Sequence, residues 1–164
     1  MPIFDYNLVS TKAVYRNYIP RDFPDLLRLA LRRSEEHKGD PATAREAIAL
    51  TVAEFSRHKG RGAILLIDVE ESPVGYCILS NRWSHVRGGT TVCVEELYLT
   101  ADGQRRGLAE DLLGLLAEIA PGGSVAIQLE VPGPDRRAEA AWKRMGFHRE
   151  GNTVMIRQTR RKSP

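Results

Sequence analysis

The sequence predicts one domain of the α/β or α+β class, and three observations support this. The chain has 164 residues, a length typical of a single domain. Apolar runs that indicate strands are interleaved with segments whose apolar residues recur at helical spacing. Hydrophobic residues make up 42% of the chain and charged residues 27%, which suits a globular protein with a buried core.

The N-terminal half predicts two helices between strands. Residues 1–11 are either a flexible lead or an extra strand. Alternation, helical spacing and breaker residues then predict a strand at 12–19, a helix from 23 to about 39, a helix around 44–55, and hairpin strands at 63–69 and 74–80.

The C-terminal half predicts two strand–helix units and a closing pair of strands. Its expected elements are a polar loop at 81–90, a strand at 92–99, a turn at 100–103 leading directly into a helix that opens at Gln104, a strand at 124–131, a last helix capped by Gly146, and strands at 147–150 and 153–158. Residues 159–164 form a basic tail, which we interpret as solvated.

The stretch 95–109 has the residues best suited to chemistry. Two carboxylates, Glu95 and Glu96, interrupt an otherwise apolar strand. The helix that follows begins with unpaired backbone N–H groups at the positive end of its dipole, which makes an anion site. Gly107 and Ala109 leave room for a phosphate close to the backbone, and the neighbouring arginines add positive charge. The stretch therefore predicts an enzyme with a phosphorylated cofactor.

This stretch resembles the acyl-CoA-binding motif of the GNAT superfamily of N-acyltransferases. That motif is Gln or Arg, two free positions, Gly, one free position, then Gly or Ala. Gln104, Gly107 and Ala109 occupy its three fixed positions. The placement of the motif between a strand and an amphipathic helix is the context that such a motif requires.

Residues 135–147 are similar to a second pattern of this family, which they match at Ala138, Gly146 and Phe147. Two positions depart from it: Asp135 replaces an Asn, and Trp142 replaces a Tyr. A carboxylate repels phosphate, so Asp135 weakens one cofactor contact. An indole cannot protonate a departing thiolate, so the thiolate leaves unprotonated, or Tyr98 or a water serves as the acid. We favour Trp142 as a core aromatic on its helix.

The resemblance implies a GNAT-like fold, with a mixed, mostly antiparallel central sheet and helices on both faces. It implies acetyl-CoA as the acyl donor and an acceptor pocket shaped by the N-terminal sixty residues. The backbone N–H groups around Leu97 would hold the oxyanion. The residues that it implicates in cofactor binding are Leu97, Tyr98, Leu99, Gln104, Arg105, Arg106, Gly107, Leu108, Ala109, Asp135 and Trp142.

An amine must lose a proton before it attacks a thioester, so the reaction needs a base. We predict Glu95 as the base, Glu96 as a substrate-binding or orienting group, and Tyr98 as a candidate acid. In a regular strand the two carboxylates point to opposite faces, and Glu95 shares the buried face of Cys93 and Leu97. A β-bulge, usual at this position in the family, would alter that parity. The alternative is that both carboxylates are exposed strand-edge charges.

We expect the acceptor to be the primary amine of a small cationic molecule, which attacks directly in a ternary complex. Paired carboxylates after a Trp-containing loop are similar to diamine and polyamine acetyltransferases, and this places Trp83 and Glu96 in substrate binding. Two alternatives stay open. One is a non-catalytic acyl-CoA-binding module, and the other is an acetyltransferase of protein N-termini or lysines.

Composition argues against other classes of protein. The net charge of +3 is too small for a nucleic-acid-binding face. The four histidines and two cysteines lack metal-ligand spacing, so we expect no metal site. No apolar run approaches the ~20 residues that span a bilayer, and no signal peptide is visible. We therefore expect no membrane partner and a cytoplasmic location, and we leave a homodimer open.

Overall fold

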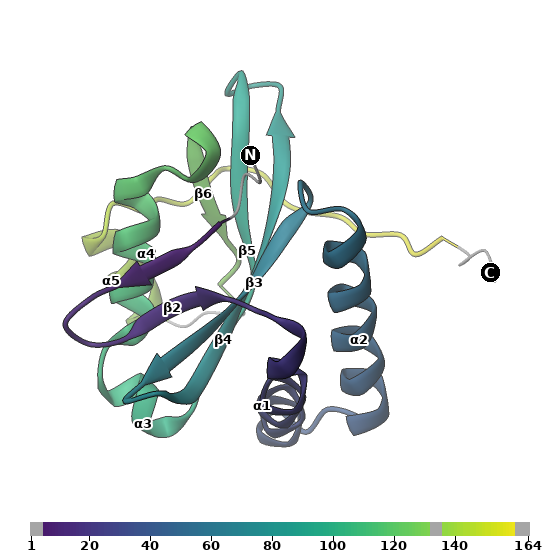
Figure 1. Cartoon of the computed structure of the whole chain (residues 1–164). Coiled ribbons are helices and arrows are strands. Elements are labelled where there is room, and N and C mark those ends of the chain that lie inside the picture. The colour runs from purple at the N-terminus through teal and green to yellow at the C-terminus, as the bar shows by residue number, and fades with distance from the viewer. Residues whose placement is uncertain (1–4, 132–135, 160–164) are drawn as a thin grey trace.

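A twisted six-stranded sheet forms the centre of the molecule (Figure 1). The computed structural model describes residues 5–131 and 136–159. The strands are β1 (Asn7–Val9), β2 (Val14–Asn17), β3 (Gly62–Val69), β4 (Ser72–Ser84), β5 (Gly89–Leu99) and β6 (Ala126–Leu129). They lie in sequence order, every neighbouring pair is antiparallel except β5 and β6, and the predicted mixed, mostly antiparallel sheet is confirmed.

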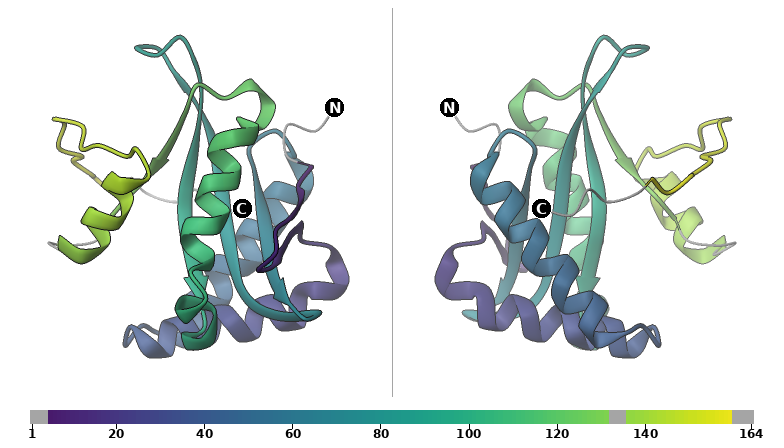
Figure 2. Two further views of the ribbon diagram at one scale, coloured as in Figure 1. Left: turned by 90° about the vertical axis from the view of Figure 1, so that its left-hand side faces the viewer. Right: turned by 90° about the vertical axis from the view of Figure 1, so that its right-hand side faces the viewer.

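Helices cover both faces of this sheet, as predicted. Figure 2 shows α4 in front of one face and α2 in front of the other. The helices are α1 (Phe23–Glu36), α2 (Pro41–Arg57), α3 (Ala101–Arg105), α4 (Leu108–Ile119) and α5 (Arg136–Arg144). Within the described part of the chain, no helix is long and apolar enough to cross a membrane.

Two apolar clusters attach the helices to the sheet. The cluster under α1 and α2 includes Leu26, Leu29, Ile48, Leu66, Tyr76 and Tyr98. The cluster under α4 includes Tyr15, Leu65, Ile67, Leu79, Leu108, Leu112, Leu113 and Leu116. A fully buried leucine contributes about 1.5–3 kcal/mol relative to an exposed one, so these clusters account for much of the folding free energy.

Three predicted segments differ from the structure. Residues 81–90 are not a loop, because β4 and β5 continue as a paired hairpin up to Ser84 and Gly89; main-chain pairing does not require apolar side chains. The predicted helix from Gln104 is divided, because Gly107 adopts the left-handed conformation (φ 67°) between α3 and α4. Residues 147–159 contain no strand.

Both chain ends show smaller differences. Residues 7–9 form the extra strand β1, one of the two alternatives for the N-terminal segment, whereas residues 1–4 lie outside the described residues. The predicted closing strands are irregular, and their apolar side chains at 154–156 are exposed. Apart from residue 159, the basic tail also lies outside the described residues.

The predicted cap of the last helix is confirmed. Gly146 has a φ of 90°, and its N–H donates to the carbonyl of Lys143. The N–H of Phe147 donates to the carbonyl of Trp142. The rings of these two residues pack edge to face, with their centroids 6.3 Å apart. Those two hydrogen bonds and the apolar contact define a Schellman motif.

Gly75 lies where β4 and β5 pack closely, and it gives a test of the sheet. A Cβ at Gly75 would lie 2.3 Å from the carbonyl oxygen of Tyr98. We expect Gly75→Ala to lower the free energy of unfolding by about 1–3 kcal/mol, because the backbone of β5 must move. Gly114→Ala in α4 is the control, since nothing lies within 4 Å of its Cβ position, and it should stabilise by about 0.5–1 kcal/mol. Urea unfolding measures both, and equal effects would contradict this packing.

Candidate active site

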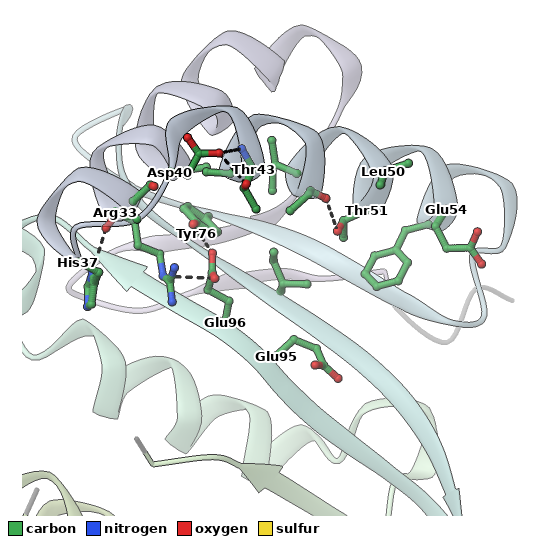
Figure 3. Close-up of a pocket in the computed structure, with 18 of the residues that line it drawn as sticks. Arg33, His37, Asp40, Thr43, Leu50, Thr51, Glu54, Tyr76, Glu95 and Glu96 are labelled. Carbon is green, nitrogen blue, oxygen red and sulfur yellow. Dashed lines mark hydrogen bonds and ion pairs between the residues drawn. The ribbon is translucent and has the colours of Figure 1, made fainter. Parts of the chain in front are cut away.

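A cavity of about 720 Å³ lies between α2 and the strands β4 and β5, next to the C-terminal end of α1 (Figure 3). Its volume is within the range of small-molecule sites. One wall is a single face of α2, and the opposite wall carries Tyr76, Ile78 and Ser80 from β4 and Glu95 and Glu96 from β5. The cavity therefore adjoins the strand on which the sequence predicts the chemistry.

A β-bulge at Glu95 directs both carboxylates into this cavity. Ile78 pairs with Glu96 and the next residue of β4 pairs with Val94, so Glu95 is an extra residue in β5. The extra residue reverses the alternation: Val94 packs on the α4 side before the bulge, and Leu97 does so after it. The parity of a regular strand, with the carboxylates on opposite faces, is thus absent, and the bulge expected from the family is present.

Glu96 is held in place by two partners. The Tyr76 hydroxyl donates a hydrogen bond to one of its carboxylate oxygens, and Arg33 Nε lies 3.2 Å from the other. Burial raises the pKa of Tyr76 well above its ordinary value, and the neighbouring Glu96 raises it further, so the phenol stays a donor. A charge-assisted hydrogen bond and a cation thus fix the Glu96 carboxylate in place, and its role as an orienting group stays a prediction.

Glu95 has no such cation among the residues that the structure describes. Within residues 5–131 and 136–159, its hydrogen-bond partner is the hydroxyl of Ser80, which donates to Oε1. The side chain is exposed and lines the cavity, so the burial that a regular strand predicts for it is absent. The bulge moves Leu97 to the α4 side, whereas Cys93, whose pKa is raised by burial, stays close enough to Glu95 for this carboxylate to contribute to the raised pKa. An accessible carboxylate with no ion pair is available to accept a proton from a bound amine.

On its other side, β5 leaves an open edge. It pairs with β6 only from Thr91 to Val94, and β6 ends at Leu129. Beyond the bulge, the segment 95–99 runs on without a neighbouring strand on that edge among the described residues. Its main-chain groups can therefore bind an extended ligand as an added strand would, which fits the pantetheine arm expected there.

The open edge leads to the start of α4. Gly107 precedes this helix and has no side chain to cap it, so the first N–H groups, at residues 108–110, lack intrahelical partners. A Cβ at Gly107 would also fill the space in front of them. The Gln104 amide donates 2.9 Å to the carbonyl oxygen of Leu99 and ties this corner to β5. These features fit an anionic diphosphate group.

The two arginines of the motif, Arg105 and Arg106, are already ion-paired at this corner. Arg106 Nε lies 2.9 Å from one oxygen of Asp102, and Arg105 Nη2 lies 3.7 Å from the other. Both guanidinium groups therefore share one carboxylate. Whether they also contact a bound phosphate stays a prediction.

The structure separates several predicted residues from the cavity. Tyr98 lies under α1, and its hydroxyl donates 2.9 Å to Glu36; burial and this bond raise the pKa of Tyr98 to about 12. Trp142 packs on the apolar cluster under α4, as its core interpretation predicts. Trp83 is 69% exposed, on the outer part of β4, and does not line the cavity. Asp135 lies outside the described residues.

Other residues of the cavity were not identified from the sequence. They include Arg33 and His37 of α1, Tyr76 and Ser80 of β4, and a polar or small face of α2 formed by Thr43, Ala47, Thr51 and Glu54. The three- and four-residue spacing of that face was readable as a second helix face. No group of three or more possible metal-ligating side chains occurs among the residues the structure describes.

A carboxylate-lined cavity that meets an open strand edge and an anion-binding helix start defines a group-transfer enzyme with a phosphorylated donor. The chain belongs to the acetyltransferase (GNAT) family, whose model matches residues 23–147. The protein is therefore a GNAT N-acetyltransferase, and an acyl-CoA is the donor that this family uses. No curated protein is significantly similar to the chain.

Solved structures share the fold at low identity. A possible acetyltransferase from Clostridium difficile 630 is 15% identical, with a TM-score of 0.73 over 90% of this chain and 98% of that one. AAC(6')-Iy, solved with the bisubstrate analog CoA-S-monomethyl-acetylneamine, is 16% identical, with a TM-score of 0.70 over 91% and 99%. A ribosomal-protein-alanine N-acetyltransferase from Brucella melitensis biovar Abortus 2308 is 17% identical, with a TM-score of 0.67 over 90% and 99%.

The placement of Tyr98 yields a prediction. We expect Tyr98→Phe to keep turnover within about threefold of the wild type, because its hydroxyl is bonded to Glu36 and does not line the cavity. The same change should cost about 1 kcal/mol of unfolding free energy. Steady-state thiol release and urea unfolding measure the two effects, and Glu36→Ala, which removes the same bond, is the matched control. A loss of turnover by 10²-fold or more in Tyr98→Phe alone would identify Tyr98 as the acid.

Proposed function

We propose that the protein transfers an acetyl group from acetyl-CoA to the primary amine of a small cationic molecule. The observation that carries this proposal is the charge of the cavity. Four carboxylates line it, those of Asp40, Glu54, Glu95 and Glu96, against one guanidinium, that of Arg33. Arg33 pairs with Glu96 and Arg61 pairs with Glu54, so the excess negative charge is that of Asp40 and Glu95. Such a surface attracts an ammonium group and raises its local concentration.

The residues can perform a direct transfer. An amine with a pKa near 10 enters mostly protonated. Glu95 accepts a proton from it, directly or through a water, and the freed lone pair forms the new N–C bond to the acetyl carbon. The C–S bond breaks, sulfur leaves as the thiolate, the anion of a group with a pKa of about 8.5, and the nitrogen gives up its second proton to water as the amide forms. The backbone N–H groups near Leu97 stabilise the charge on the carbonyl oxygen.

The arrangement of β5 supports attack in a ternary complex. The same segment, 95–99, carries the carboxylates on one side and the open edge on the other. Donor and acceptor bound to these two surfaces would meet at the bulge, so no covalent enzyme intermediate is required. Cys93, the half-buried cysteine nearest to the bulge, has its pKa raised by burial, which disfavours it as a nucleophile.

Two rival functions remain testable. The solved relatives include one bound to an acetylneamine analog and one named for a ribosomal protein, so the fold is compatible with both small-molecule and protein acceptors. A non-catalytic acyl-CoA-binding module is the other rival, and the replacement of the family Tyr by Trp142 favours it. The expected cytoplasmic location and the open question of a homodimer stay as predictions.

Thiol release from acetyl-CoA separates these functions. We expect release with diamines, polyamines or aminoglycosides, and little with acidic amino acids or N-terminal peptides, because the cavity carries excess negative charge. Release that depends only on peptides would support the protein acetyltransferase. Tight binding of CoA in calorimetry, with no release for any acceptor, would support the non-catalytic module.

Glu95 is the residue whose replacement tests the mechanism. Glu95→Gln should lower kcat/KM by about 10²–10⁴-fold for the best acceptor, because proton removal is lost. The loss should be greatest near neutral pH and should shrink at high pH, where the free amine is present without help. Glu118→Gln on the exposed face of α4 is the control and should match the wild type. An unchanged pH–rate profile for Glu95→Gln would remove Glu95 from the base role.

A further inference from the structure

Lys12 lies beside the start of α4, although about ninety residues separate the two in the sequence. It belongs to the turn between β1 and β2. A Cβ built on Gly107 would lie 3.5 Å from Lys12 Nζ, so the ammonium borders the space next to the residue that precedes the helix. The absence of a side chain at Gly107 keeps that space open.

This turn is attached to α4 by a hydrogen-bond network. The Ser10 hydroxyl donates 2.6 Å to Asp111 Oδ2, and the buried Tyr15 hydroxyl donates 2.5 Å to the same oxygen. Ser10 Oγ also accepts the N–H groups of Lys12 and Ala13. Burial, and then the bond to Asp111, raises the pKa of Tyr15, so its hydroxyl remains a donor. The network fixes the backbone from which Lys12 projects.

The electrostatics of this position call for an anion. A helix start is the positive end of the dipole, where a lysine ammonium is unfavourable by itself. Lys12 makes no ion pair with any carboxylate among the described residues, although Glu110 Oε2 lies 3.7 Å from the same Cβ position at Gly107. The two arginines of the motif, by contrast, are already paired with Asp102. Lys12 is therefore a cation in this corner that has no ion pair within the described part of the chain and is accessible to an anion.

We propose that Lys12 binds the diphosphate of the acyl-CoA donor and is a donor-binding residue of this enzyme. The proposal rests on the proposed function, since it places the donor at the start of α4. Lys12 supplies a point charge and N–H donors, and the uncapped amides of residues 108–110 supply the rest. The neutral pantetheine arm lies along β5, away from Lys12.

Calorimetry with CoA, dephospho-CoA and pantetheine tests this without an acceptor. We expect Lys12→Met to raise the Kd of CoA about 10-fold or more, because one charge-assisted contact is lost. Dephospho-CoA, which lacks the 3′-phosphate, should lose affinity by the same factor, and pantetheine should be unaffected. Lys12→Arg should recover most of the affinity. Lys59→Met, at an exposed lysine after α2, is the control and should bind as the wild type does.

Thermal unfolding without ligand checks that the variant folds. Lys12→Met should unfold at the wild-type temperature or slightly above it, since a cation leaves the positive end of α4. Wild-type affinity of Lys12→Met for CoA would overturn the proposal. A loss with CoA but none with dephospho-CoA would also overturn it, by assigning Lys12 to the 3′-phosphate. Failure of the wild type to bind CoA would instead refute the proposed function.

Discussion

The β-bulge at Glu95 is the constraint on which the site depends. One extra residue reverses the alternation of β5, so Glu95 and Glu96 line one cavity while Leu97 still packs towards α4. The bulge also stands where pairing with β6 stops, and bulges bend and twist a strand. An acceptor surface and an open donor edge are thus created at a single point of one strand.

The surroundings of the bulge give the two carboxylates different partners. Arg33, from α1, and Tyr76, from β4, hold Glu96. Glu95 has only the hydroxyl of Ser80. A carboxylate bound to a cation is a poor proton acceptor, whereas one with a neutral partner keeps that capacity. The roles of Glu95 as base and Glu96 as orienting group stay predictions, and this difference in partners is their structural basis.

Much of the fold could be predicted because its signals are local. Apolar runs located β3 and the core of β5, and helical spacing located α1, α2 and α4. The predicted helix is interrupted at Gly107, where φ is positive. Glycine permits a positive φ but does not require one, so the sequence alone does not predict the interruption. The parity of the carboxylates depended on cross-strand register with β4, which one strand's sequence does not contain. Likewise, Lys12 and Arg33 reach their sites only through tertiary packing.

The wall of the acceptor cavity comes largely from one face of α2, whereas the bulge and the open edge belong to β5. Under the proposed function, acceptor recognition and chemistry would reside on separate elements, because the short side chains of Thr43, Ala47 and Thr51 line the cavity. Replacement of these side chains can reshape the chamber while leaving the reacting strand intact. Such a division lets a lineage exchange one amine for another by altering a few positions on a single helix.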